Sequence, residues 1–159
     1  MKHRFDTITS DFTCKHCQNH VSTDPILSGV NNRNHCPYCL YSRHMDHFEA
    51  GDRLSACKAE MRPVGLTVKK AHKKYGKQQG ELMIIHQCID CGKLSINRTA
   101  ADDIADYLLE IYHAARQMSR ATRQQIEQAG IEILDDERLV RARLFGWKGE
   151  PIGQTLSFA

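Results

Sequence analysis

Long apolar runs are absent from this sequence of 159 residues. No stretch approaches the roughly 18 to 20 consecutive apolar residues that a membrane-spanning helix needs. The first six residues also lack the apolar stretch of a secretory signal. The seven cysteines are an odd number, which a closed disulfide framework cannot use. These absences exclude a membrane protein and a secreted disulfide-stapled miniprotein, and we expect a cytoplasmic protein whose thiols stay reduced.

Signatures of common enzyme classes are absent as well. The sequence contains no G-x-S-x-G nucleophile turn, no phosphate-binding Walker loop and no G-x-G-x-x-G dinucleotide loop. In zinc deaminases a proline precedes the paired cysteines, whereas here Pro37 follows Cys36. We therefore expect a protein without enzymatic activity.

The cysteines are arranged in pairs. Three C-x-x-C pairs begin at Cys14, Cys36 and Cys88, while Cys57 stands alone. Two residues between two thiols allow one tight turn to aim both sulfurs at a single point, as a tetrahedral zinc ion requires. Eighteen residues separate the first pair from the second, a spacing typical of a zinc ribbon. The four ligands of the first predicted zinc site are Cys14, Cys17, Cys36 and Cys39.

A second zinc site is predicted with its fourth ligand left open. Three sulfurs are available, from Cys57, Cys88 and Cys91. If residues 83–88 form a strand, His86 and Cys88 face the same side, which favours His86 as the fourth ligand; His44 is the alternative. For the first site, a redox-active C-x-x-C pair is the competing interpretation, but the flanks lack the strand-to-helix context that it needs. Seven cysteines and one histidine give eight ligands, enough for two Zn²⁺ per chain.

The second cysteine pair lies within a longer pattern. Residues 33–37 read Arg-Asn-His-Cys-Pro, and matching residues extend over about residues 10–105. They include Phe12, the seven cysteines, His44, Asp46, Gly51, Asp52, Arg53, Met61, Pro63, His86, Gly92, Asn97 and Arg98. This pattern resembles the bacterial RNHCP domain family. The resemblance implies a compact, cysteine-rich, zinc-binding domain; it assigns no function, and it contains both candidate histidines.

The two halves of the chain differ in pattern. Residues 1–98 combine strand-like segments at 7–9 and 82–85 with turn signals, and this half would depend on metal for stability. From Thr99, which resembles a helix N-cap, apolar residues recur at helical spacing. We predict helices over 100–118, 120–129 and 135–144. The predicted fold class is α+β, with a zinc-ribbon or zinc-knuckle domain at 1–98, a helical region at 99–145 packed on it, and a tail at 146–159.

Positive charge is concentrated in the first half. Residues 1–98 carry 15 basic and 9 acidic side chains, whereas residues 99–159 carry 7 and 10. Loading the two zinc sites would bring the formal net charge of +3 close to zero, so the overall charge argues little for nucleic-acid binding. The excess is local, beside Tyr75, in a lysine segment made of Lys69, Lys70, Lys73, Lys74 and Lys77.

The lysine segment decides the functional prediction. Lysines suit sequence-independent phosphate contacts, and a tyrosine can stack on an unpaired base. We therefore predict a structural zinc-binding protein that binds RNA or the ribosome through a basic loop. The alternative is a protein–protein adaptor without nucleic-acid binding, in which the lysines are a solvated face and the acidic helical half offers the contact surface.

Overall fold

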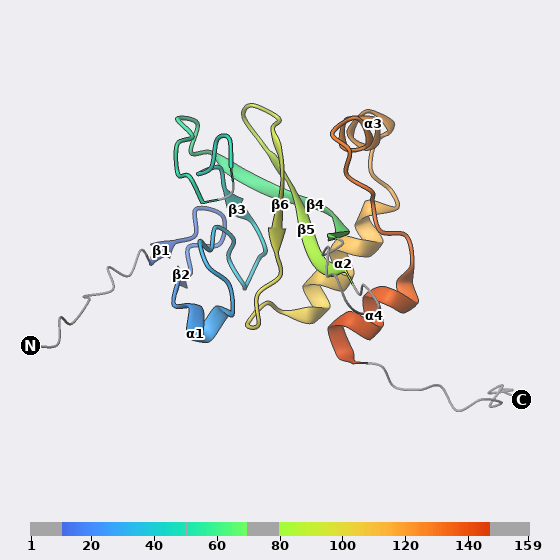
Figure 1. The fold of residues 1–159 in the computed structure, drawn as a ribbon, viewed down its shortest axis with the longest axis horizontal. Helices are drawn as coiled ribbons and strands as arrows, with labels where there is room; N and C mark the ends of the chain where they lie inside the picture. The colour runs from blue at the N-terminus through green and yellow to red at the C-terminus, as the bar shows by residue number, and fades with distance from the viewer. Residues whose placement is uncertain (1–10, 50, 70–79, 147–159) are drawn as a thin grey trace, which may run out of the picture.

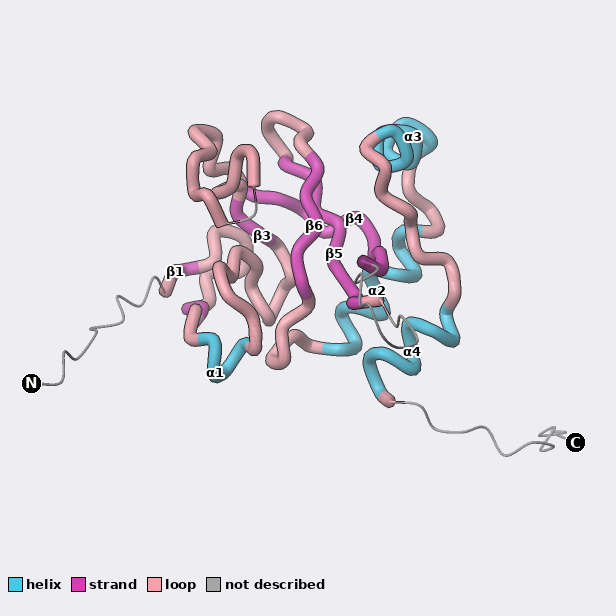
Figure 2. The backbone as a smooth tube through the Cα atoms, viewed as in Figure 1, coloured by secondary structure: helices cyan, strands magenta, loops and turns pink. Residues whose placement is uncertain are grey.

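The computed structural model describes residues 11–49, 51–69 and 80–146. Residues 11–59 form a lobe that consists mainly of loops (Figure 2). Its regular elements are short: β1 (Phe12–Thr13), β2 (His20–Val21), α1 (Pro25–Ser28) and β3 (Ser42–Arg43). Strands β1 and β2 pair with each other, and β3 pairs with the main sheet. The apolar cluster within the lobe is small and consists of Val21 and the cysteines around it, with Phe12 at its edge.

The main sheet is antiparallel, with the strand order β3-β4-β5-β6. Its long strands are β4 (Glu60–Lys69), β5 (Glu81–Cys88) and β6 (Leu94–Arg98). Strand β5 lies between two partners and is buried along nearly its whole length, which explains its continuous apolar run. The pairing of β4 with β5 shifts register between Pro63 and Gly65, where the proline has no N–H to donate.

Three helices follow the sheet: α2 (Ala105–Ala115), α3 (Arg120–Gln128) and α4 (Glu137–Phe145). Helix α2 packs on β4, and α4 packs on α2, so the helices lie on the side of the sheet away from the lobe (Figure 1). The core between them consists of Leu40, Leu66, Leu82, Ile84, Leu108, Tyr112 and Val140. This arrangement confirms the predicted α+β class with C-terminal helices.

The helix starts differ from the prediction in two places. Helix α2 begins at Ala105 and not at residue 100, and its N-cap is Ile104, not Thr99. The residues before it cannot join the helix because the Asp103 carboxylate accepts a hydrogen bond from the Ala100 N–H and binds the lobe. Helix α4 is capped by Asp136, one residue later than expected. The predicted strand at 7–9 and the tail from residue 147 onward lie outside the described residues.

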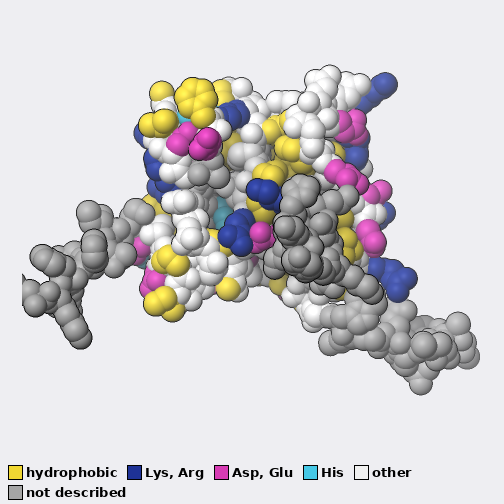
Figure 3. Space-filling view, in the orientation of Figure 1, with side chains coloured by type: hydrophobic (Ala, Val, Ile, Leu, Met, Phe, Trp, Pro, Cys, Tyr) yellow, Lys and Arg dark blue, Asp and Glu magenta, His cyan; other side chains and the backbone are white. Residues whose placement is uncertain are grey.

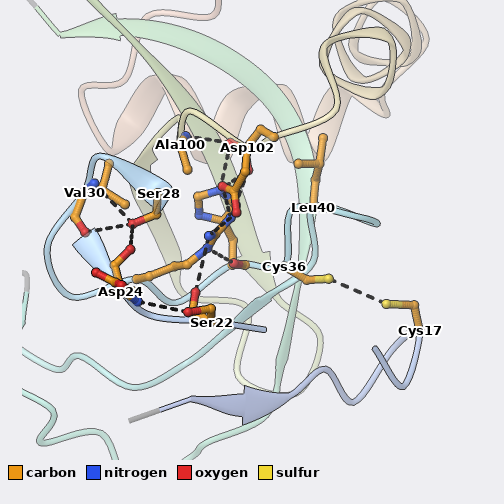
Figure 4. A network of polar contacts seen from close by, with 12 residues as sticks. Cys17, Ser22, Asp24, Ser28, Val30, Cys36, Leu40, Ala100 and Asp102 are labelled. Carbon is orange, nitrogen blue, oxygen red and sulfur yellow. Dashed lines mark hydrogen bonds and ion pairs between the residues drawn. The ribbon is translucent and has the colours of Figure 1, made fainter. Parts of the chain in front are cut away.

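A buried ion-pair network joins the lobe to the start of α2 (Figure 4). The Arg33 guanidinium is fully buried and donates to both oxygens of Asp102, each at 2.8 Å. His35 donates from Nε2 to Asp103 at 2.8 Å. Removing one partner of such a buried pair typically costs about 3–5 kcal/mol, because the other charge is left uncompensated. The network therefore fixes the lobe against the helical part.

Within the described residues, no helix has the length and apolar content to cross a bilayer.

Candidate metal centres

The three C-x-x-C pairs fold into the same kind of turn. In each, the N–H of the fourth residue after the first cysteine donates to the carbonyl of that cysteine, at 2.8–3.1 Å. The N–H of the first cysteine donates in turn to the carbonyl five residues later. The fourth residue has a positive φ of 64° at Gln18, 63° at Leu40 and 74° at Gly92. Of these three residues, only Gly92 is of a type from which the sequence predicts a positive φ. This shared knuckle turn directs both sulfurs of a pair to one side.

The first group consists of the four cysteines that the spacing predicted. The sulfurs of Cys14, Cys17, Cys36 and Cys39 all lie within 4.8 Å of one another. Sulfur pairs from opposite knuckles, Cys14 with Cys39 and Cys17 with Cys36, are 3.6 Å apart. A tetrahedral ion with Zn–S bonds of about 2.3 Å sets sulfurs about 3.8 Å apart, so the spacing fits such an ion. This group can hold one metal ion.

The environment of these sulfurs also favours a cation. Burial raises the pKa of the Cys36 thiol to about 11. Burial acts against ionisation of Cys17 too, but hydrogen bonds from the Asn19 backbone N–H and side-chain amide outweigh it and lower that pKa to about 7. Four thiolates this close repel one another, so all four ionise together only when a cation offsets their charge.

The second group forms where four strands of the main sheet end. Cys88 is the last residue of β5 and pairs with Met61 near the start of β4. His44 follows β3 directly, and its N–H donates to the Ala59 carbonyl, two residues after Cys57. These strand ends bring together Cys57, Cys88, Cys91 and His44, whose ligand atoms all lie within 4.8 Å of one another. In Figure 1 the loop that follows β3 lies at the upper left, and the turn between β5 and β6 lies next to it at the top.

The distances in the second group suit a mixed sulfur and nitrogen site. The Cys57 and Cys88 sulfurs are 3.6 Å apart, and His44 Nδ1 lies 3.4 Å from the Cys91 sulfur. A tetrahedral ion with about 2.3 Å to sulfur and 2.0 Å to nitrogen sets two sulfurs about 3.8 Å apart and a sulfur and a nitrogen about 3.5 Å apart. Cys57 and Cys91 are exposed, unlike Cys14 and Cys36. The second group can therefore also hold a metal ion, at a more accessible position.

The preference for His86 as the fourth ligand is wrong, and His44 occupies that place. Both ring nitrogens of His86 are engaged elsewhere: Nε2 donates to the Leu40 carbonyl at 2.7 Å, and Nδ1 accepts from the Asn97 amide at 2.8 Å. Complete burial lowers the pKa of His86 to about 3, so the ring is neutral. The strand argument fails because the knuckle turn, and not the pleat of β5, aims the Cys88 sulfur. His86 instead ties the second knuckle, Cys36–Cys39, to the sheet.

The Arg-Asn-His string before Cys36 connects the two metal groups. Arg33 and His35 bind the aspartates ahead of α2, as described above. Asn34 donates to Asp46 at 3.1 Å and accepts a hydrogen bond from Arg53, so it holds the loop that follows His44. Sequence reasoning missed the role of Asp102 and Asp103, which lie within the helix that it predicted over 100–118. The sequence contains no signal for these contacts, because the burial of Arg33 and His35 is visible only in the structure.

The predicted nucleic-acid-binding residues are mostly beyond the described part of the chain. Lys69 is the last residue of β4 and pairs with Glu81 at the start of β5. The other members of the lysine segment, Lys70, Lys73, Lys74 and Lys77, lie outside the described residues together with Tyr75. The strands on either side show that the segment connects β4 to β5, at the opposite end of these strands from the second metal group.

Two closed groups of four ligands on an α+β scaffold define a cysteine-rich metal-binding protein. The model of one family, the RNHCP domain, matches residues 9–109. This chain belongs to the RNHCP domain family. The match spans both metal groups and ends within α2. No curated protein and no solved structure matches the chain.

Proposed function

We propose that both groups hold Zn²⁺ and that the ions are structural. The observation that carries this proposal is the pair of closed donor sets, four sulfurs in one and three sulfurs with one imidazole in the other. Thiolate and imidazole donors in tetrahedral sets of this kind are typical of structural zinc, whereas a catalytic zinc keeps one position for water. Each zinc then acts as a cross-link between segments distant in sequence.

We further propose that the zinc-supported scaffold presents a basic loop that binds RNA, alone or within the ribosome. Support comes from the lysine segment, with five lysines and a tyrosine within nine residues, between two long paired strands. Lysine contacts to phosphate are independent of base sequence, so the segment suits RNA of any sequence. Unpaired RNA suits it best, because a tyrosine can stack only on an accessible base.

RNA binding is tested by measuring the affinity of the full metal-loaded chain for a single-stranded RNA at increasing salt. If all five lysines contact phosphates, the logarithm of the binding constant falls with the logarithm of salt with a slope of up to about −3.5. Between 50 and 200 mM salt the affinity then falls about 100-fold. Replacing the five lysines by glutamine should remove most of this salt dependence and most of the affinity.

A matched control removes five positive charges from the helical part. The control variant replaces Arg116, Arg120, Arg123, Arg138 and Arg143 by glutamine. It should keep the affinity of the wild type within a fewfold, since it changes net charge equally but leaves the loop intact. Equal binding by the wild type and the lysine variant would contradict the proposal. A partner protein that remains bound after nuclease treatment would then favour the adaptor function.

A further inference from the structure

The two metal groups differ in how far solvent reaches their sulfurs. In the second group Cys57 and Cys91 are exposed. In the first group two cysteines are buried, Cys14 and Cys36, and the other two are half-buried. Figure 3 shows hydrophobic and charged side chains at the surface over the loop that follows β3, at the upper left. A small reactive molecule in solution therefore reaches sulfurs of the second group more readily than sulfurs of the first.

Contacts around the first group restrict its sulfurs further. The rings of His16 and Tyr41 stack with centroids 3.5 Å apart and planes 4° apart, which joins the first knuckle to the second. The Asn19 amide donates to the Cys17 sulfur at 3.3 Å. A sulfur that accepts hydrogen bonds of this kind is a poorer nucleophile, because part of its charge is already engaged. Cys57, by contrast, lies outside any knuckle turn.

A second sulfur lies within reach of Cys57. The Cys57 sulfur is 3.6 Å from that of Cys88, a residue that is only 2% exposed. The other exposed cysteine, Cys91, faces His44 Nδ1 at 3.4 Å, and a nitrogen cannot take part in a disulfide. An exposed cysteine next to a second, resolving cysteine is the usual arrangement at redox-sensing sites. In this group, Cys57 and Cys88 have that arrangement.

We propose that the second metal group is an oxidation site for hydroperoxides, where Cys57 and Cys88 form a disulfide and the zinc ion is released. The inference rests on the proposed zinc occupancy of this group and is independent of RNA binding. Only thiolates and neutral imidazoles bind the ion, so a disulfide removes two of its four ligands. Cys91 and His44 alone do not make a closed zinc site. The first group keeps its ion.

The oxidation balances with hydrogen peroxide as the only oxidant. The Cys57 thiolate attacks one peroxide oxygen, so an S–O bond forms, the O–O bond breaks and hydroxide leaves. The Cys88 thiolate then attacks the Cys57 sulfur, so an S–S bond forms, the S–O bond breaks and a second hydroxide leaves. Each sulfur loses one electron, and the two electrons reduce the peroxide. Two protons from solvent convert the two hydroxides into water.

The disulfide would preserve part of the cross-link that the metal provides. Cys57 and Cys88 are 31 residues apart and belong to the loop after β3 and the end of β5. A bond between them keeps these two segments joined while His44 and Cys91 are released. The loop also keeps the hydrogen bond from Asn34 to Asp46 at 3.1 Å. We therefore expect oxidation to empty the second group without unfolding the chain, and a dithiol reductant with added zinc to reverse it.

The direct test adds hydrogen peroxide to the zinc-loaded full chain and follows zinc release with a zinc-binding chromophore. One zinc ion per chain should leave about tenfold faster than the other. Peptide mass mapping should then find a Cys57–Cys88 disulfide, with the four thiols of the first group still reduced. Added dithiothreitol and zinc should restore two ions per chain.

A variant without the exposed sulfur should resist the oxidant. Cys57→His replaces that sulfur by an imidazole, so it should carry two zinc ions and release the second about tenfold more slowly than the wild type. The matched control is Ala56→His, which places an imidazole at the neighbouring exposed position and retains Cys57. It should release zinc as the wild type does.

Elemental analysis before oxidation separates this inference from the proposed function. One zinc ion per wild-type chain at that stage would contradict the zinc occupancy and the oxidation site together. With two ions present, release of both at the same rate, a disulfide between other cysteines, or unchanged release by Cys57→His would overturn the oxidation site alone. The first two of these results come from the wild type and do not depend on the folding of the variant.

Discussion

A Cys14→Ser variant should bind one zinc ion per chain and lose the fold of residues 11–41 while it keeps the sheet and helices. The first metal group joins the segment around Cys14 to the segment around Cys36, and the apolar cluster around it contains only Val21 and Phe12 besides the four cysteines. Structural zinc binding contributes about 10–16 kcal/mol in small zinc domains, which equals or exceeds the whole stability of an ordinary domain. Elemental analysis gives the metal count, and backbone NMR shows which amides lose their dispersed signals.

The corresponding variant for the second group is Cys57→Ser, which removes one of its ligands. It should also bind one zinc ion, but residues 11–41 should stay folded, because the first two knuckles and the Arg33 network remain intact. All described cysteines belong to one of the two groups, so the pair compares the two centres with the same chemical change. Retention of two zinc ions by either variant would contradict the ligand assignment.

Replacing the two candidate histidines should produce opposite results. His44→Ala should lose the second zinc ion, and His44→Cys should restore it as a four-sulfur site. His86→Ala should keep both ions but lower the free energy of unfolding by about 2–5 kcal/mol. The reason is that His86 is fully buried and its removal leaves the Leu40 carbonyl and the Asn97 amide without partners.

Metal content and urea unfolding of the zinc-saturated variants distinguish these outcomes. Loss of a zinc ion in His86→Ala with retention in His44→Ala would reverse the assignment. Arg98→Ala serves as a matched surface control, since Arg98 lies on β6 next to Asn97 and forms an exposed ion pair with Glu81. Exposed ion pairs contribute only about 0–1 kcal/mol, so this variant should be close to the wild type in both measurements.

The local features of the fold could be predicted from the sequence, because they depend on neighbouring residues. The C-x-x-C spacing identified three knuckles, and the periodic apolar residues located α3 to within one residue and α4 to within two. Strand β4 was missed, because Pro63 and Gly65 argue against a central strand; the structure accommodates them at a register shift. The start of α2 was misplaced because Asp103 is used by His35, a contact across 68 residues.

The fourth ligand of the second group could not be predicted for a related reason. His44 reaches the three sulfurs only because β3 pairs with β4 and β4 with β5, and sequence spacing does not contain those pairings. His86 was nearer to Cys88 in sequence, and the expected alternation along β5 favoured it. The structure shows that the end of the strand is where this alternation stops, since Cys88 already belongs to the knuckle turn.

The central claim is that the folded chain contains two structural zinc ions. Native mass spectrometry of the full chain, with elemental analysis of the same sample, tests it most directly. We expect a single species with two zinc ions per chain, which loses its fold when a strong chelator removes them. A folded chain that carries fewer than two ions, or that keeps its fold after both are removed, would contradict this account.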